Sequence, residues 1–157
     1  MHQRLVVGEL CRLCQREGLE QELVLLAVDL AVADRRILAV RSSALLFLDV
    51  DQYKDVNDSR GHRAGDDLLT SLALLLSQRL RDTDVVARLG GDEFAILLPH
   101  ADADQATAVA KDLLDAIRAH TFVVAGAPLG VTVSLGIALY PEHGTAAGDL
   151  LSRADMA

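Results

Sequence analysis

Two segments of the sequence place carboxylates at the ends of apolar runs, where they could bind a metal ion. Asp49 closes the run ALLFLDV (44–50), and Asp92-Glu93 follows a glycine pair and precedes FAILLP. Either carboxylate alone is more often structural, because acidic residues are common at turns and strand ends. If the two segments are neighbours in one sheet, however, their carboxylates converge, and two close anions repel each other unless a cation lies between them. Oxygen ligands favour Mg²⁺ or Mn²⁺, so the pattern predicts a divalent-metal site that also takes up phosphate groups.

Only one of the two adjacent acids is expected to share that metal. Side chains alternate between the faces of a strand, so Asp92 and Glu93 should point to opposite faces. The acidic run 49–58 also raises the possibility of a calcium loop. An EF-hand loop requires Gly at its sixth position, and either register of this run places a basic residue there, which excludes that interpretation.

The elements that must position these acids follow from hydrophobic periodicity and turn residues. We expect helices at 4–28, 52–58, 66–80, 102–120 and in the tail 146–157, and strands at 44–50, 84–89, 92–98, 122–125 and 131–139, with 29–42 unassigned. Gly61 and Gly65 are expected in a loop, and Asp66 could cap the helix after it. The Gly90-Gly91 pair predicts a hairpin, and a Gly-Ala-Pro turn separates the last two strands. The result is an α/β (α+β) fold in one domain, with helices on a mostly antiparallel sheet and a helical lead-in.

Composition narrows the class of protein. The 157 residues are 51% hydrophobic, with 15 Lys+Arg against 23 Asp+Glu and a net charge of −8. This excludes a disordered chain and argues against nucleic-acid binding, which needs cations to neutralise phosphates. We expect no membrane segment, no signal peptide and a cytoplasmic location, because no apolar run reaches about 18 residues. Cys11 and Cys14 are interpreted as small apolar residues of a helix, because a zinc site would need a second ligand pair.

Several motifs in order resemble one family. R88-L-G-G-D-E-F94 looks like the signature of the GGDEF family of diguanylate cyclase domains. L48-D-V-D-Q-Y-K-D-V-N-D58, G61-H-R-A-G-D66, V131-T-V-S-L-G-I-A138 and L150-L-S-R-A-D155 are similar to its further motifs. The resemblance covers roughly residues 43–157.

The resemblance implies a fold, a reaction and a metal site. The family has a palm-like nucleotidyl-cyclase fold and condenses two GTP molecules into cyclic di-GMP, releasing two pyrophosphates. Asp49, the backbone carbonyl of Val50 and Asp92 match its metal ligands, for Mg²⁺ or Mn²⁺. Asp92 and Glu93 match its catalytic acids. This favours Asp92 as the acid that shares the metal.

The resemblance also assigns the remaining site residues. Asn57 and Asp66 match the guanine-reading pair, whose amide and carboxylate suit the N1–H, N2–H₂ and O6 groups of guanine. Lys54 would contact phosphate, and Tyr53 would lie against the substrate. Gly90 and Gly91 would let the nucleotide approach the backbone.

A second, inhibitory site is implied upstream of the signature. R81-D-T-D84 has the R-x-x-D pattern of the family's product-inhibition site, where Arg81 would grip cyclic di-GMP and Asp84 would accept a hydrogen bond from a base. The alternative is a helix-terminal arginine beside a turn aspartate.

The sequence predicts one domain division and leaves two alternatives for activity. We expect 1–28 to be a lead-in or linker and 29–157 to be the GGDEF domain, active as a homodimer with one GTP per subunit. Only about seven residues separate Arg36 from Ala44, too few for the family's first helix, and the sequence ends before the family's Lys- and Arg-bearing tail. The alternative is a degenerate, non-catalytic module that binds GTP or cyclic di-GMP and regulates a partner.

Overall fold

The computed structural model describes residues 42–157. The expected helix 4–28, most of the unassigned segment and both cysteines lie outside the described residues, and the division of the chain after residue 28 stays a prediction. The elements are β1 (Ser43–Val50), α4 (Tyr53–Arg60), α5 (His62–Arg79), β2 (Val85–Gly90), β3 (Glu93–Pro99), α6 (Ala103–Ala119), β4 (Phe122–Val124), β5 (Ala127–Leu129), β6 (Val133–Tyr140) and α7 (Ala147–Asp155).

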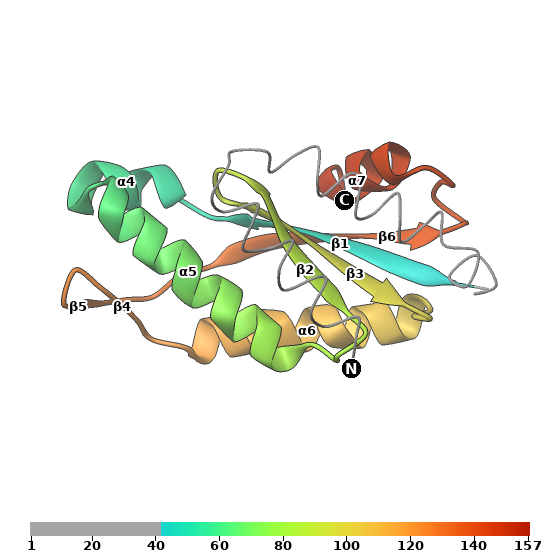
Figure 1. Ribbon diagram of the computed structural model, residues 1–157, viewed down its shortest axis with the longest axis horizontal. Coiled ribbons are helices and arrows are strands. Elements are labelled where there is room, and N and C mark those ends of the chain that lie inside the picture. The colour runs from blue at the N-terminus through green and yellow to red at the C-terminus, as the bar shows by residue number, and fades with distance from the viewer. Residues whose placement is uncertain (1–41) are drawn as a thin grey trace.

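The main sheet has the strand order β2-β3-β1-β6, and its neighbouring strands are antiparallel. β1 lies between β3 and β6, which explains why its sequence is a nearly continuous apolar run. Helices cover this sheet on both faces (Figure 1). The expected α/β fold with a mostly antiparallel sheet surrounded by helices is confirmed.

Alternate side chains of β1 face the two helical layers. Leu46 and Leu48 join the larger core cluster, which includes residues of α5 and α6. Leu45 and Phe47 join the smaller cluster, which includes Leu150 of α7. Strand alternation therefore turns Asp49, two residues after Phe47, toward the layer of α7.

The start of α5 differs from the expectation. The helix begins at His62 and not at residue 66, so Gly65 lies inside it and Asp66 does not cap it. Gly61, with φ of 88°, separates α4 from α5. Gly65 is required by packing, because a Cβ atom there would collide with Asn57 Oδ1 and lie 2.7 Å from the Tyr53 hydroxyl. A glycine that predicts a loop can equally mark two helices in close contact.

The segment after α6 also differs. The expected Gly-Ala-Pro turn is only partly a turn, because Ala127–Leu129 forms β5 and pairs with β4 in a separate two-stranded sheet. The turn itself is Ala125-Gly126, with φ of 52° and 77°. Positive φ at both central positions is the geometry of a tight two-residue hairpin.

Helix α7 approaches β6 closely through Gly136. A Cβ atom at Gly136 would collide with the carbonyl oxygen of Ala154 in α7. We expect Gly136→Ala to lower the free energy of unfolding by about 1–3 kcal/mol through overpacking, measured by urea denaturation. Gly130→Ala, where a Cβ meets nothing within 4 Å, is the matched control. Equal stabilities of the two variants would contradict this packing.

Within residues 42–157, none of the helices combines the length and apolarity needed to cross a bilayer.

Candidate active site

An open cleft of about 790 Å³ lies where β1 ends and α4 begins. It is lined by Phe47, Asp49, Val50, Asp51, Gln52, Tyr53, Lys54, Asp92, Ser134, Leu135, Gly136, Ala154, Asp155 and Ala157. The sheet, the first turn of α4 and helix α7 therefore all contribute to one concave surface. Of the expected site residues, Asp49, Val50, Tyr53, Lys54 and Asp92 lie in its wall.

Acidic side chains from β1, the β2–β3 turn, β3 and α7 influence one another beside this cleft. Burial, and then the charge of Asp92, raise the pKa of Asp49. Burial, and then the charge of Asp49, raise the pKa of Glu93. Asp155 of α7 contributes to both shifts. The neighbouring charges thus make Asp49 and Glu93 harder to ionise, which is the electrostatic condition that a bound cation relieves.

Contrary to the prediction from the sequence, Asp92 and Glu93 do not alternate along one strand. Asp92 lies in the turn between β2 and β3, before strand geometry begins at Glu93. Glu93 pairs directly with Asp49 across β1 and β3, so the two side chains share a face of the sheet. Both acids therefore lie near Asp49, although only Asp92 lines the cleft.

The donors at this position fit Mg²⁺ or Mn²⁺. Among residues 42–157, no group of three or more His, Cys, Asp or Glu side chains is arranged around a common metal position. Mg²⁺, however, commonly takes one or two carboxylates and completes its shell with water and substrate phosphates. Asp49, Asp92 and the Val50 backbone would supply that number of oxygen ligands.

The turn from β1 into α4 is held by three hydrogen bonds from neighbouring strands and turns. Val50 N donates to Asp92 O at 3.3 Å, and Asp51 N donates to Thr132 O at 3.0 Å. Ser134 Oγ donates to Asp51 Oδ1 at 2.8 Å. Gln52 then takes a left-handed conformation, with φ of 58°, before α4 begins. These contacts fix the backbone of Val50 relative to both Asp49 and Asp92.

The expected guanine-reading residues lie at the corner between α4 and α5, outside the wall of the cleft. Asn57 Oδ1 is buried with no hydrogen-bond partner among the described residues. Asp66 is exposed on α5, one residue after the glycine that admits the Asn57 side chain. A buried amide oxygen without a donor is costly, so this corner has an unmet hydrogen-bonding requirement.

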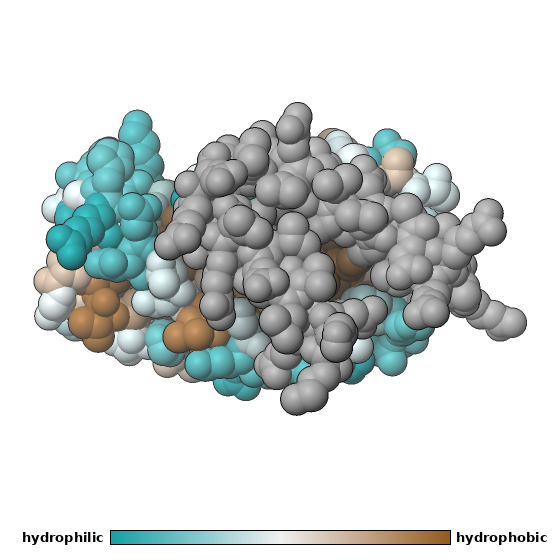
Figure 2. Space-filling view, in the orientation of Figure 1, coloured by the Kyte–Doolittle hydropathy of each residue, from teal (hydrophilic) through white to brown (hydrophobic). Residues whose placement is uncertain are grey.

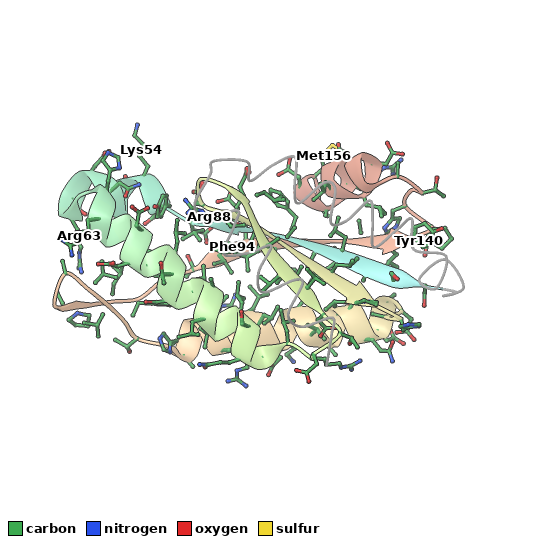
Figure 3. The ribbon with its side chains drawn as sticks, viewed as in Figure 1. Lys54, Arg63, Arg88, Phe94, Tyr140 and Met156 are labelled. Carbon is green, nitrogen blue, oxygen red and sulfur yellow. The ribbon has the colours of Figure 1, made fainter. Side chains whose placement is uncertain are left out.

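Lys54 and the glycine pair belong to different elements, Lys54 to α4 and the glycines to the end of β2 and the β2–β3 turn. Lys54 projects from α4 away from the domain (Figure 3). Gly91 has φ of 53° in the β2–β3 turn, and Arg88 Nε donates to its carbonyl oxygen at 2.9 Å. The expected hairpin at Gly90-Gly91 is confirmed, with Gly90 as the last residue of β2.

Arg81 and Asp84 lie in the turn between α5 and β2. Arg81 N donates to Asp84 Oδ2 at 2.8 Å, and Asp84 N donates to Arg81 O at 3.1 Å. The Arg81 side chain is exposed. The aspartate thus stabilises the turn, and the inhibitory site stays a prediction.

Sequence reasoning did not name the residues of the cleft wall that come from β6, α7 and the turn after β1, among them Asp51, Ser134, Gly136 and Asp155. Two of the quoted motifs, V131–A138 and L150–D155, contain three of them. Their place near Asp49 depends on the antiparallel register of β1 with β6 and on the packing of α7, which spacing alone does not give.

Comparison with known proteins agrees with this geometry. The profile of the family described as diguanylate cyclase, GGDEF domain, matches residues 10–157. The chain belongs to the GGDEF family. Over 115 residues, this GGDEF chain is 44% identical to the diguanylate cyclase TpbB of Pseudomonas aeruginosa. The matched segment is 73% of this chain and 26% of TpbB. The chain therefore spans about a quarter of that relative.

Two further comparisons bear on fold and activity. A solved structure comprising only the GGDEF domain of TpbB has a TM-score of 0.78 at 36% identity, covering 87% of this chain and 79% of the other. The cyclic di-GMP phosphodiesterase NbdA of P. aeruginosa is 38% identical over 114 residues, which is 73% of this chain and 14% of NbdA. This GGDEF domain thus has relatives named for making cyclic di-GMP and for hydrolysing it.

Proposed function

We propose that this chain is a diguanylate cyclase domain, which joins two GTP molecules into cyclic di-GMP and releases two pyrophosphates. The observation that carries the proposal is the Asp49–Asp92 carboxylate pair at the open cleft, beside the Gly90–Phe94 signature. The reaction forms two 3′–5′ phosphodiester bonds, and each 3′-hydroxyl loses its proton as it attacks an α-phosphate. Such chemistry needs little covalent assistance from the protein and depends on positioning and electrostatics.

The acidic residues of the chain have separate parts in this scheme. Asp49 and Asp92 would hold Mg²⁺, with the Val50 carbonyl as a further ligand. The bound ion would lower the pKa of the attacking hydroxyl and offset charge on the departing pyrophosphate. Glu93, paired across from Asp49, adds negative charge that favours occupancy by the cation.

Substrate recognition is divided between the cleft and the α4–α5 corner. Lys54 would contact the triphosphate, and Tyr53 would lie beside the substrate. Asn57 and Asp66 would read guanine, the amide donating to an acceptor on the base and the carboxylate accepting from N1–H and N2–H₂. Adenine presents the opposite pattern on that edge and would leave both groups mismatched.

We expect the active species to be a homodimer. The product has two-fold symmetry, and one site binds one GTP, so two copies of the site must face each other to close both bonds. A rate per subunit that rises with protein concentration would support this assembly. A constant rate per subunit across dilution into a monomeric state would contradict it.

The second candidate is a module that binds GTP or cyclic di-GMP without turnover and regulates a partner. The similarity to a protein named as a phosphodiesterase favours keeping it. Calorimetric binding of GTP, measured together with pyrophosphate release, separates the two candidates. Binding with release supports the cyclase, and binding without release supports the silent module.

The inhibitory site at Arg81 has its own test. We expect Arg81→Ala to raise the cyclic di-GMP concentration that halves the rate by about tenfold, because a charge-assisted hydrogen bond to the ligand is lost. Arg79→Ala is the control, since Arg79 forms an exposed ion pair with Asp112 at 3.7 Å. An inhibition curve that is the same for Arg81→Ala and the unaltered protein would remove the assignment.

A further inference from the structure

Arg60, the last residue of α4, connects two parts of the fold that are distant in sequence. Its Nη1 donates to Val124 O at 3.1 Å and to Ala127 O at 3.4 Å. These two residues pair with each other at the closed end of the β4–β5 hairpin. One guanidinium nitrogen therefore bridges the carbonyl groups on both sides of the turn. Figure 1 shows this hairpin at the same end of the domain as the α4–α5 corner.

The hairpin needs such support. Each strand has three residues, and the hairpin forms a sheet separate from the main one. A two-stranded ribbon of this size is marginally stable alone. Ala125 takes φ of 52°, which is unfavourable for a residue with a Cβ atom. Only Phe122 and Val124 of β4 are buried, and Val123 is exposed.

Helix α4 needs support for a different reason. None of its residues is fully buried, and the surface over it is largely hydrophilic (Figure 2). Apolar packing therefore anchors α4 weakly, through the half-buried Tyr53 and Val56. The two hydrogen bonds of Arg60 attach its C-terminal end directly to the hairpin.

Asn57 lies one turn before Arg60 in the same helix. Its backbone carbonyl accepts a hydrogen bond from Gly61 N at 2.8 Å, immediately after Arg60. Its side-chain oxygen is buried against Gly65 of α5. A shift of the last turn of α4 would therefore move the Asn57 carboxamide relative to α5 and Asp66.

We propose that Arg60 is a positioning residue for guanine recognition: by holding the β4–β5 hairpin, it fixes the last turn of α4 and so the Asn57 side chain. This inference rests on the proposed function, in which Asn57 contacts the base. Neither Arg60 nor the β4–β5 hairpin is among the residues that line the cleft.

A double-mutant cycle on nucleotide binding tests the proposal. The probe is 3′-deoxy-GTP with Mg²⁺, which lacks the attacking hydroxyl and so reports binding without turnover. Arg60→Met removes the donors at similar side-chain length. We expect it to raise the Kd by about three- to tenfold, the cost of a weakened hydrogen bond. In an Asn57→Ala background the same substitution should change the Kd by less than about twofold, because residues that act through one contact are not additive.

Two controls separate positioning from general loss of structure. Arg60→Lys keeps a cationic donor and should recover most of the affinity. Arg63→Met removes a positive charge from the exposed start of α5 and should leave the Kd unchanged. Arg63 is labelled in Figure 3 at the same end of the domain.

The outcomes are distinct from those of the proposed function. If the unaltered protein does not bind 3′-deoxy-GTP, the proposed function is contradicted, and this inference with it. If it binds, but Arg60→Met has no effect or an equal effect in both backgrounds, only the positioning role is overturned. Non-additivity together with rescue by Arg60→Lys supports it.

Discussion

Replacing Asp92 with asparagine is expected to lower the rate of cyclic di-GMP formation and, without metal, to raise the melting temperature. The rate should fall by roughly a hundredfold to a thousandfold, as when one preorganised electrostatic group is removed from an active site. The melting temperature should rise by roughly 1–3 °C, because the repulsion between the Asp92 and half-buried Asp49 carboxylates disappears. Product assays and thermal denaturation in EDTA measure the two effects on one preparation.

The pH dependence of the stability difference provides a check on its cause. The pKa values of Asp49 and Glu93 are raised above the ordinary 3.8 and 4.5, so the folded protein holds these protons more tightly than the unfolded chain does. Stability from this source is therefore present at low pH and is lost as the pH rises through the raised pKa values. The advantage of Asp92→Asn should vanish below about pH 3 and be full at neutral pH.

Mg²⁺ should reverse the order of the two melting temperatures, so that the unaltered protein has the higher one. An ion that binds the folded state raises its melting temperature, and it should do so for the unaltered protein more than for Asp92→Asn. Full turnover by Asp92→Asn would refute its metal role. An unchanged melting temperature in EDTA would show that the carboxylates do not repel each other in the folded protein.

Replacing Gly65 with alanine is expected to destabilise the protein although alanine is the better helix former. In an open helix position this change typically stabilises by about 0.5–1 kcal/mol. Here the new Cβ would collide with Asn57 Oδ1 and lie 2.7 Å from the Tyr53 hydroxyl, so α4 and α5 must separate. Overpacking of this kind costs about 1–3 kcal/mol, which outweighs the gain in helix propensity.

The matched control for this prediction is Gly148→Ala in α7, where a Cβ meets nothing within 4 Å. Urea denaturation should show opposite signs for the two glycine variants. Gly65→Ala should also weaken GTP binding, because Asn57 is displaced, whereas Gly148→Ala should not. A gain of stability at both positions would mean that α4 and α5 are not in contact at Gly65.

Some features of the fold could be predicted from the sequence because their signals are local. The run ALLFLDV identified β1, since a strand paired on both sides and covered on both faces is almost entirely apolar. The glycine pair identified the β2–β3 hairpin. Asp102 and His120 were expected as the ends of a helix and are its N-cap and C-cap residues, the former in a capping box with Gln105.

Other features depend on contacts between distant segments. The pairing of Asp49 with Glu93 follows from strand register, and the position of Asp92 follows from where β3 begins. The two glycines of GHRAGD predict a loop, but Gly65 is a helix residue that packs against Asn57 of another helix. That contact has no signal in the local sequence. Arg60 contacts a carbonyl 64 residues further along the chain, and nothing in its local sequence indicates that contact.

The most direct test of the central claim is the identity of the product. The purified protein is incubated with GTP and Mg²⁺, and nucleotides and pyrophosphate are quantified by mass spectrometry and an enzymatic assay, with Asp92→Asn and an EDTA-treated sample alongside. We predict cyclic di-GMP with two pyrophosphates per molecule from the unaltered protein with metal, formation slower by roughly a hundredfold or more with Asp92→Asn, and no product in EDTA. GTP binding without cyclic di-GMP formation, or equal product from Asp92→Asn, would contradict the cyclase assignment.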